Sequence, residues 1–140
     1  MLVLDTNVVS ELMRPRPVSA VLDWFAGHDI RKMYLTAISE AELHYGVATT
    51  PTGKRKTILK NAMAYWLDHG FGERILPFDS AAARAYGEIA AECRRSGRPI
   101  SKFDCQIEAI CQARNAVLVT RNVRDFQYAG IGVADPWVGA

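Results

Sequence analysis

Short apolar runs of strand character alternate with longer stretches of helical periodicity in this chain, and this alternation restricts its fold more than any other feature. Strands separated by helices need crossover connections, so they pair in parallel and are covered by helices on both faces. The strands are apolar, as strands buried on both faces are. The sequence therefore predicts an α/β fold, a three-layer α/β/α sandwich with a mostly parallel sheet.

The expected elements follow from hydrophobic spacing and from the Gly, Pro and capping residues between them. Strands are predicted at residues 2–4, 33–37, 75–78, 117–120 and 131–134. Helices are predicted at residues 7–13, 18–27, 39–49, 54–69 and 103–114, and one more, capped by Asp79 or Ser80, runs to Arg95. The order of the strands in the sheet is left open.

The 140 residues match the size of one ordinary domain, so a single domain over residues 1–140 is expected. Hydrophobic residues make up 49% and charged residues 23%, which is typical of a globular protein with a core. No apolar run approaches the ~20 residues that span a bilayer. The N-terminus lacks the basic region of a signal peptide and soon reaches Asp5. We therefore expect a cytoplasmic protein without a membrane segment.

Two groups of basic residues are candidates for phosphate contact, although the net charge of +2 does not by itself indicate a nucleic-acid ligand. These groups are Lys54, Arg55, Lys56 and Lys60, and then Arg94, Arg95, Arg98 and Lys102. Each group can equally be the solvated face or end of a helix, and the sequence leaves both interpretations open.

Acidic residues from distant parts of the chain fall at one predicted edge of the sheet. Right-handed crossovers with short loops bring the carboxyl ends of the strands and the amino ends of the helices to that edge, where ligand sites form. Asp5 follows the first strand, Glu42 lies in the first turn of the helix after the second strand, and Asp104 opens the helix before the fourth strand. Asn122 and Asp125 follow that fourth strand directly.

Carboxylates that converge repel one another, and a divalent cation relieves the repulsion. Hard oxygen ligands select Mg²⁺ or Mn²⁺. Each acid also has a local structural interpretation. Asp5 and Asp104 can cap helices. Glu42 can complete a capping box with Ser39, and Asp125 can hold a turn. The spacing alone leaves the metal site and these local roles open.

Four segments of the chain carry a resemblance to a known family. They are Leu4-Asp5-Thr6-Asn7-Val8, Ser39-x-x-Glu42-Leu43-x-x-Gly46, Asp104 at the start of a helix, and Thr120-Arg121-Asn122-x-x-Asp125-Phe126. Together they resemble the PIN domain and, more narrowly, the VapC-type toxins of bacterial toxin–antitoxin pairs, including the FitB-like branch. The resemblance runs from Met1 to the Asp135-Pro136-Trp137 ending.

The resemblance implies an endoribonuclease, a hydrolase of RNA phosphodiester bonds that uses Mg²⁺ or Mn²⁺. Asp5, Glu42 and Asp104 match the acidic triad of the family and would hold the metal. Some members carry Asp where this chain has Asn122, so the fourth position falls to Asn122 or to Asp125. The residues expected to support them are Thr6 and Asn7, beside Asp5, and Ser39 or Thr120, which would orient metal-bound water.

The expected reaction is in-line hydrolysis by metal-activated water, with one ion or two, giving a 5′-phosphate product. Unpaired bases would be recognised in a groove, and transfer, messenger and ribosomal RNA all stay open as targets. The resemblance also implies a homodimer and a cognate VapB-like antitoxin, whose DNA-binding part represses the shared operon. Its C-terminal segment would lie in an apolar groove, and candidate walls, which can equally be core, are Val8–Leu12, Val18–Phe25 and Ile58–Trp66.

Three other kinds of protein compete with this interpretation. A phosphatase of the haloacid dehalogenase type needs a second Asp two residues after the first, and position 7 is Asn7. A response-regulator receiver needs an acidic pair after the first strand, where Asp5 stands alone. A non-catalytic PIN-like module that binds RNA or a partner is compatible with Asn122, but the three main acids argue against it.

Overall fold

The computed structural model describes residues 1–138, so Gly139 and Ala140 of the predicted 1–140 domain lie outside the described residues. Each predicted strand and helix is present, with bounds that differ by a few residues. The elements are β1 (Leu2–Leu4), α1 (Thr6–Leu12), α2 (Ser19–Ala26), η1 (Ile30–Lys32), β2 (Met33–Thr36), α3 (Ala37–Ala48), α4 (Lys54–Tyr65), η2 (Trp66–Phe71), β3 (Ile75–Leu76), α5 (Ser80–Arg95), α6 (Lys102–Arg114), β4 (Val117–Val119), η3 (Val123–Phe126) and β5 (Val133–Ala134).

The five strands form one sheet in the order β3-β2-β1-β4-β5, and every neighbouring pair is parallel. This confirms the predicted α/β class with a mostly parallel sheet. β1 lies at the centre, with Val3 opposite Tyr34 of β2 and Leu118 of β4. The chain leaves β1 toward β2 on one side and returns to β4 on the other, so the winding direction reverses between β1 and β4.

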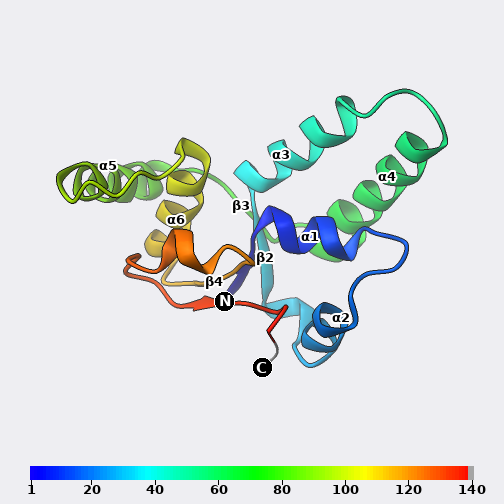
Figure 1. The fold of residues 1–140 in the computed structure, drawn as a ribbon, viewed down its shortest axis with the longest axis horizontal. Coiled ribbons are helices and arrows are strands. Elements are labelled where there is room, and N and C mark those ends of the chain that lie inside the picture. Colours follow the sequence, from blue (N-terminus) through cyan, green and yellow to red (C-terminus); the bar gives the residue numbers. More distant parts are fainter. Residues whose placement is uncertain (139–140) are drawn as a thin grey trace.

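Helices cover both faces of the sheet (Figure 1). Leu4 and Val119 pack with α1, α2, α3 and α4 on one face. Val3 and Leu118 point to the other face and pack with Ile107 of α6, and α5 packs against α6. Successive strand residues thus alternate between two cores, as the pleat of a strand requires. No helix in the described part of the chain is long and apolar enough to cross a membrane.

Two helix starts differ from the prediction. α3 begins at Ala37 and is capped by Thr36, whose hydroxyl accepts a hydrogen bond from the Ser39 backbone N–H at 3.0 Å. The predicted Ser39 start and the capping-box role of Glu42 are therefore wrong, and Glu42 lies in the second turn instead of the first. α6 is capped by Ser101, not by Asp104, whose backbone N–H donates to the Ser101 hydroxyl at 3.1 Å.

The predicted helix over residues 54–69 changes character before its end. α4 is α-helical to Tyr65, and η2 continues as a π-helical turn that stops at Gly72, whose φ is 56°. A residue with positive φ cannot extend a right-handed helix, and Gly accepts this conformation without strain. The third strand is shorter than predicted because Pro77, directly after Leu76, has no N–H to donate to a sheet.

Candidate active site

Asp5 and Thr120 directly follow the adjacent strands β1 and β4, at the point where the winding of the sheet reverses. The Asp5 backbone N–H donates to the Val119 carbonyl at 2.8 Å and joins the two strand ends. Crevices outside the carboxyl ends of strands at such a reversal are the usual ligand sites of open α/β sheets. The predicted edge is therefore the location of the candidate site.

The carboxylate of Asp5 is buried, with 5% of the residue exposed, and is held by hydrogen bonds at both oxygens. Oδ1 accepts from the Thr6 backbone N–H at 2.8 Å, which caps α1. Oδ2 accepts from the Thr120 hydroxyl at 2.8 Å and from the Asn7 side-chain amide at 3.4 Å. Asp5 thus both caps a helix and presents a fixed carboxylate at the sheet edge.

The chain after β4 is fixed by the same network. Thr120 Oγ1 accepts from the Asn122 backbone N–H at 3.0 Å and from the Asn7 side-chain amide at 3.3 Å. Asn7 Oδ1 in turn accepts from the Arg121 backbone N–H at 3.2 Å. Asn7 and Thr120 therefore hold the loop that follows β4 against the start of α1, and they fix where Asn122 leaves the sheet.

Glu42 reaches the site through a hydroxyl of α1. Thr6 Oγ1 lies 2.7 Å from Glu42 Oε1 and 2.8 Å from Ser39 Oγ. Because a hydroxyl has one proton, Thr6 donates it to the carboxylate and accepts from Ser39. Ser39 is fully buried inside the first turns of α3, so it fixes Thr6 and, through it, Glu42.

Asp104 lies in the first turn of α6 and is partly buried. Burial raises the pKa of the Asp104 carboxyl above its ordinary value, a hydrogen bond from the Ser101 hydroxyl opposes this rise, and the negative charge of Asp125 adds to it. Asp125 itself lies in the short 3₁₀ turn η3 and is exposed. Asp125 is therefore a charge neighbour of Asp104.

The pKa of the Asp5 carboxyl is raised above its ordinary value, chiefly because burial disfavours the charged form. The hydrogen bonds from Thr120 and Thr6 lower this pKa, whereas the charges of Asp104 and Glu42 raise it. Asp5, Glu42 and Asp104 thus act on one another electrostatically even though 99 residues separate the first from the last along the chain.

The donor set of this edge suits a hard divalent cation. Asp5, Glu42 and Asp104 offer carboxylate oxygens, which are the ligands that Mg²⁺ and Mn²⁺ prefer. A cation bound among them would offset the repulsion between their negative charges. Within residues 1–138, no three Asp, Glu, His or Cys side chains stand in metal-binding geometry. The charges of Glu42 and Asp104 act on Asp5 without the three side chains forming a preformed metal site. Asn122 and Asp125 are exposed.

Sequence reasoning missed two residues near the acids. Ser101 both caps α6 and lowers the pKa of Asp104, and the Ser101-x-x-Asp104 spacing of an N-cap was the signal for it. Glu108 is 5% exposed on α6, four residues after Asp104 and so on the same face of the helix. Its burial had no sequence signal, since Glu is rarely buried.

The chain matches the PIN domain family over residues 2–131. It is 41% identical to the VapC ribonuclease Y4jK of Sinorhizobium fredii, over 98% of each chain. It is 36% identical to toxin FitB of Neisseria gonorrhoeae, over 98% of this chain and 99% of that protein. The structure of FitAB bound to an IR36 DNA fragment gives a TM-score of 0.90 at 36% identity, over 98% of this chain and 96% of that chain. The chain therefore belongs to the PIN-domain family, as a homologue of the VapC ribonucleases and the FitB toxin.

Proposed function

We propose that this chain is the toxin of a toxin–antitoxin pair and an endoribonuclease that hydrolyses RNA phosphodiester bonds with a divalent metal ion. The observation that carries the proposal is the buried Asp5 carboxylate, whose pKa is raised chiefly by burial and further by the charges of Asp104 and Glu42. A group held in this way favours a cation beside it. PIN-domain nucleases generally depend on a divalent metal, and Mg²⁺ or Mn²⁺ is proposed here.

The residues divide into those that hold the metal and those that orient them. Asp5, Glu42 and Asp104 would hold the ion, with Asn122 or Asp125 as the fourth position. When bound, the metal lowers the pKa of water and stabilises charge on the phosphate oxygens. Asp5 keeps one orientation because Thr6 and Thr120 bond its two oxygens.

The supporting residues set the direction of the Asp5 and Glu42 side chains. Thr6 donates to Glu42, so one Glu42 oxygen is occupied and the other is free to face the cation. Ser39 donates to Thr6 and fixes the direction of that hydroxyl. Asn7 holds Thr120, which donates to Asp5. The hydrogen bonds from Thr120 and Thr6 favour the ionised form of Asp5, which is the form that binds a metal.

The RNA would reach the acids from the side of α5 and α6. Of the two basic groups, the first lies at the end of α5, in the loop that follows and at the start of α6, close to Asp104 in the chain: Arg94, Arg95, Arg98 and Lys102. Lys54, Arg55 and Lys56 begin α4, on the opposite side of the sheet (Figure 1). Within the first group, Arg95 is paired with Glu92 and Arg98 stacks on Tyr128. We assign the other two members, Arg94 and Lys102, to phosphate contact and treat the second group as a solvated helix end.

The proposed partner is a small VapB-like antitoxin that binds DNA and represses the shared operon through the complex. This assignment rests on the similarity to FitB, which is known in a FitAB structure bound to DNA. A homodimer of this chain, as a single domain in the cytoplasm, is proposed with it. Co-purification with the product of the neighbouring reading frame tests the pairing, and a soluble neighbour that does not co-purify would refute it.

A cleavage assay on single-stranded RNA with Mg²⁺, with Mn²⁺ and with EDTA tests the enzyme activity. Wild-type protein should cut only with metal. Asp5→Asn should lower the activity about 100-fold or more. Mutating a residue that only hydrogen-bonds to a metal ligand already costs about 10–100-fold, and Asp5 is proposed as a ligand itself. Asp23→Asn, an exposed carboxylate on α2, is the matched control and should cut normally. Metal-independent cleavage, or full activity in Asp5→Asn, would contradict the proposal.

A further inference from the structure

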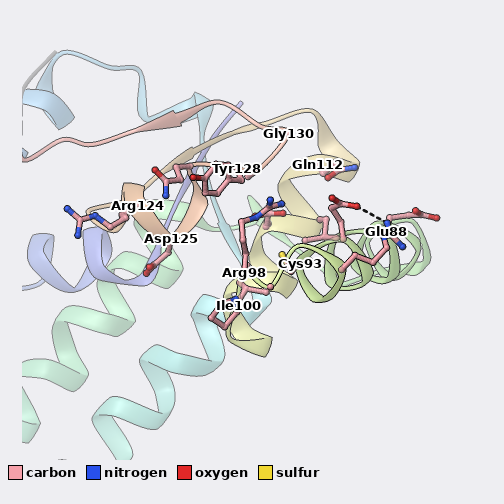
Figure 2. A pocket seen from close by; sticks show the side chains of 17 residues that line it. Glu88, Cys93, Arg98, Ile100, Gln112, Arg124, Asp125, Tyr128 and Gly130 are labelled. Atoms are coloured by element: carbon pink, nitrogen blue, oxygen red, sulfur yellow. Dashed lines mark hydrogen bonds and ion pairs between the residues drawn. The ribbon is translucent and has the colours of Figure 1, made fainter.

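A cavity of about 540 Å³ lies between α5, α6 and the segment after η3, beside the acids but separate from Asp5. Its volume falls in the range of about 300–1,000 Å³ found for small-molecule sites. Asp125 lines one end, and Figure 2 shows it there with Arg124, while Glu88 lies at the opposite end. Asp125 is also the charge neighbour of Asp104. The cavity is therefore adjacent to the acidic residues at the sheet edge.

An aromatic ring and a guanidinium group form a stacked pair in this cavity. The Arg98 guanidinium carbon lies 4.6 Å from the centroid of the Tyr128 ring, and Figure 2 shows the two side chains together in the cavity. Tyr128 is 67% exposed, so its ring area is available to a ligand. Unpaired RNA bases stack on aromatic rings and on Arg guanidinium planes of this kind.

Glu108 gives the cavity a buried acceptor. The residue is only 5% exposed, and it lines the cavity. Burial raises the pKa of the Glu108 carboxyl above its ordinary value, the charge of Arg98 lowers it, and the charge of Asp104 adds to the rise. Glu108 stands on α6 among the residues that line the cavity, so its carboxylate is within reach of a ligand there. An ionised carboxylate accepts hydrogen bonds only.

The charges of the lining favour a heterocycle over a phosphate. Arg95 is paired with Glu92 at 2.8 Å. The remaining charges of the lining are Arg98 and Arg124 against Glu88, Glu108 and Asp125. A balance close to neutral with an acidic excess does not attract a phosphate, whereas it accommodates a neutral base with hydrogen-bond donors.

We propose that this cavity is a base subsite that takes an unpaired guanine next to the scissile phosphate, stacked on the Arg98–Tyr128 pair and bonded by Glu108. Guanine alone offers two adjacent donors, N1–H and N2–H, to a carboxylate. Adenine and cytosine offer one donor beside an acceptor, and uracil offers one donor between two carbonyls. The inference rests on the proposed RNA substrate and names the base that the chain selects.

Binding measured without metal tests the subsite separately from cleavage. The probes are fluorescein-labelled heptamers of uridine with G, A, C or U in the middle, and fluorescence anisotropy follows their binding to the full chain in EDTA. The guanine probe should bind about 10-fold or more tightly than the others, which is the discrimination of one good bidentate contact. Equal affinity for the four probes would overturn the subsite.

Variants separate the two contacts. Glu108→Gln presents a donor beside an acceptor, so the preference should move from guanine to adenine and cytosine, while the exposed control Glu73→Gln should keep it. Tyr128→Ala should weaken binding of the guanine probe about 10-fold through lost stacking, and Tyr128→Phe should retain it. An unchanged guanine preference in Glu108→Gln, or undiminished binding in Tyr128→Ala, would refute the assignment.

A peptide is the other class of ligand that a cavity of this charge admits. A short arginine-containing peptide that displaces the guanine probe at equal concentration would overturn the subsite in favour of a protein ligand. Metal-dependent cleavage without base preference would leave the nuclease intact and remove the subsite. Guanine binding without any cleavage would leave the subsite intact and remove the nuclease.

Discussion

Asp5 belongs both to a helix cap and to the candidate site. Its Oδ1 caps α1 through Thr6, and its Oδ2 is held by Thr120, which directly follows β4 and lies 115 residues later in the chain. The sequence posed capping and metal binding as alternatives for Asp5, and the structure confirms the cap while leaving the second oxygen at the shared acidic edge. A carboxylate has lone pairs enough for both roles.

Thr120→Val tests the hydrogen bond to Asp5 with little change in shape. The buried hydroxyl donates to a carboxylate and also accepts from Asn7 and Asn122. Its loss should lower the free energy of unfolding by about 2 kcal/mol in urea denaturation, the usual contribution of a bond to a charged group. Thr52→Val, in an exposed loop, is the control. A loss no larger than in this control would show that the contact is weak.

The raised pKa of Asp5 makes stability depend on pH with a definite sign. In the unfolded chain the carboxyl ionises near 3.8. In the folded chain its pKa is higher, so the contribution of Asp5 is present below pH 3.8 and is lost as pH rises through the folded pKa. The unfolding free energy of wild type in EDTA, minus that of Asp5→Asn, should therefore fall as pH rises toward neutrality. A difference that rises over this window would contradict the assigned shift.

The contacts of Glu42 and the burial of Glu108 could not be predicted from local sequence patterns. The Ser39 and Glu42 spacing fits a capping box, but Thr36 takes the cap, and Glu42 turns instead to Thr6 on another helix. The residue that becomes the N-cap depends on where the preceding strand ends, and β2 ends at Thr36. The burial of Glu108 depends on α5 packing over α6, a tertiary contact that local spacing does not encode.

At the scale of elements, the starts of α1 and α6 bring the acids to the sheet edge. Asp5 is the cap of α1, and Asp104 is in the first turn of α6. Carboxylates in these positions are favoured by the positive end of the helix. These elements were predictable because apolar spacing, caps and Gly or Pro stops agree along most of the chain. The π-helical end of η2 was not, since packing of Phe71 in the core decides how that turn closes.

Two helix caps of the same kind offer a matched comparison. Ser101→Ala should reduce the unfolding free energy by about 1 kcal/mol, and so should Asp79→Ala at the start of α5. Only Ser101→Ala should also reduce metal-dependent RNA cleavage, because Ser101 orients Asp104. Parallel urea denaturation and cleavage assays check both. Equal loss of cleavage in the two variants would show that stability, not orientation of Asp104, is responsible.

At the scale of the whole molecule, the β3-β2-β1-β4-β5 order places β1 and β4 side by side and so brings Asp5 next to Thr120. Alternating strands and helices were enough to predict a parallel sheet and the edge on which the acids lie. They did not determine the strand order, because several orders satisfy short right-handed crossovers. The cavity beside Asp125 is likewise a product of how α5, α6 and the chain after η3 assemble.

Calorimetric titration of the purified, metal-free chain with Mn²⁺ asks whether its separated acids share one cation. Wild type and the exposed-site control Glu73→Gln should bind the ion alike. Asp5→Asn and Asp104→Asn should each weaken binding by about 10-fold or more, since each removes a charged oxygen ligand. Folded variants that bind Mn²⁺ as wild type does, or a wild type that binds none, would contradict the shared metal site.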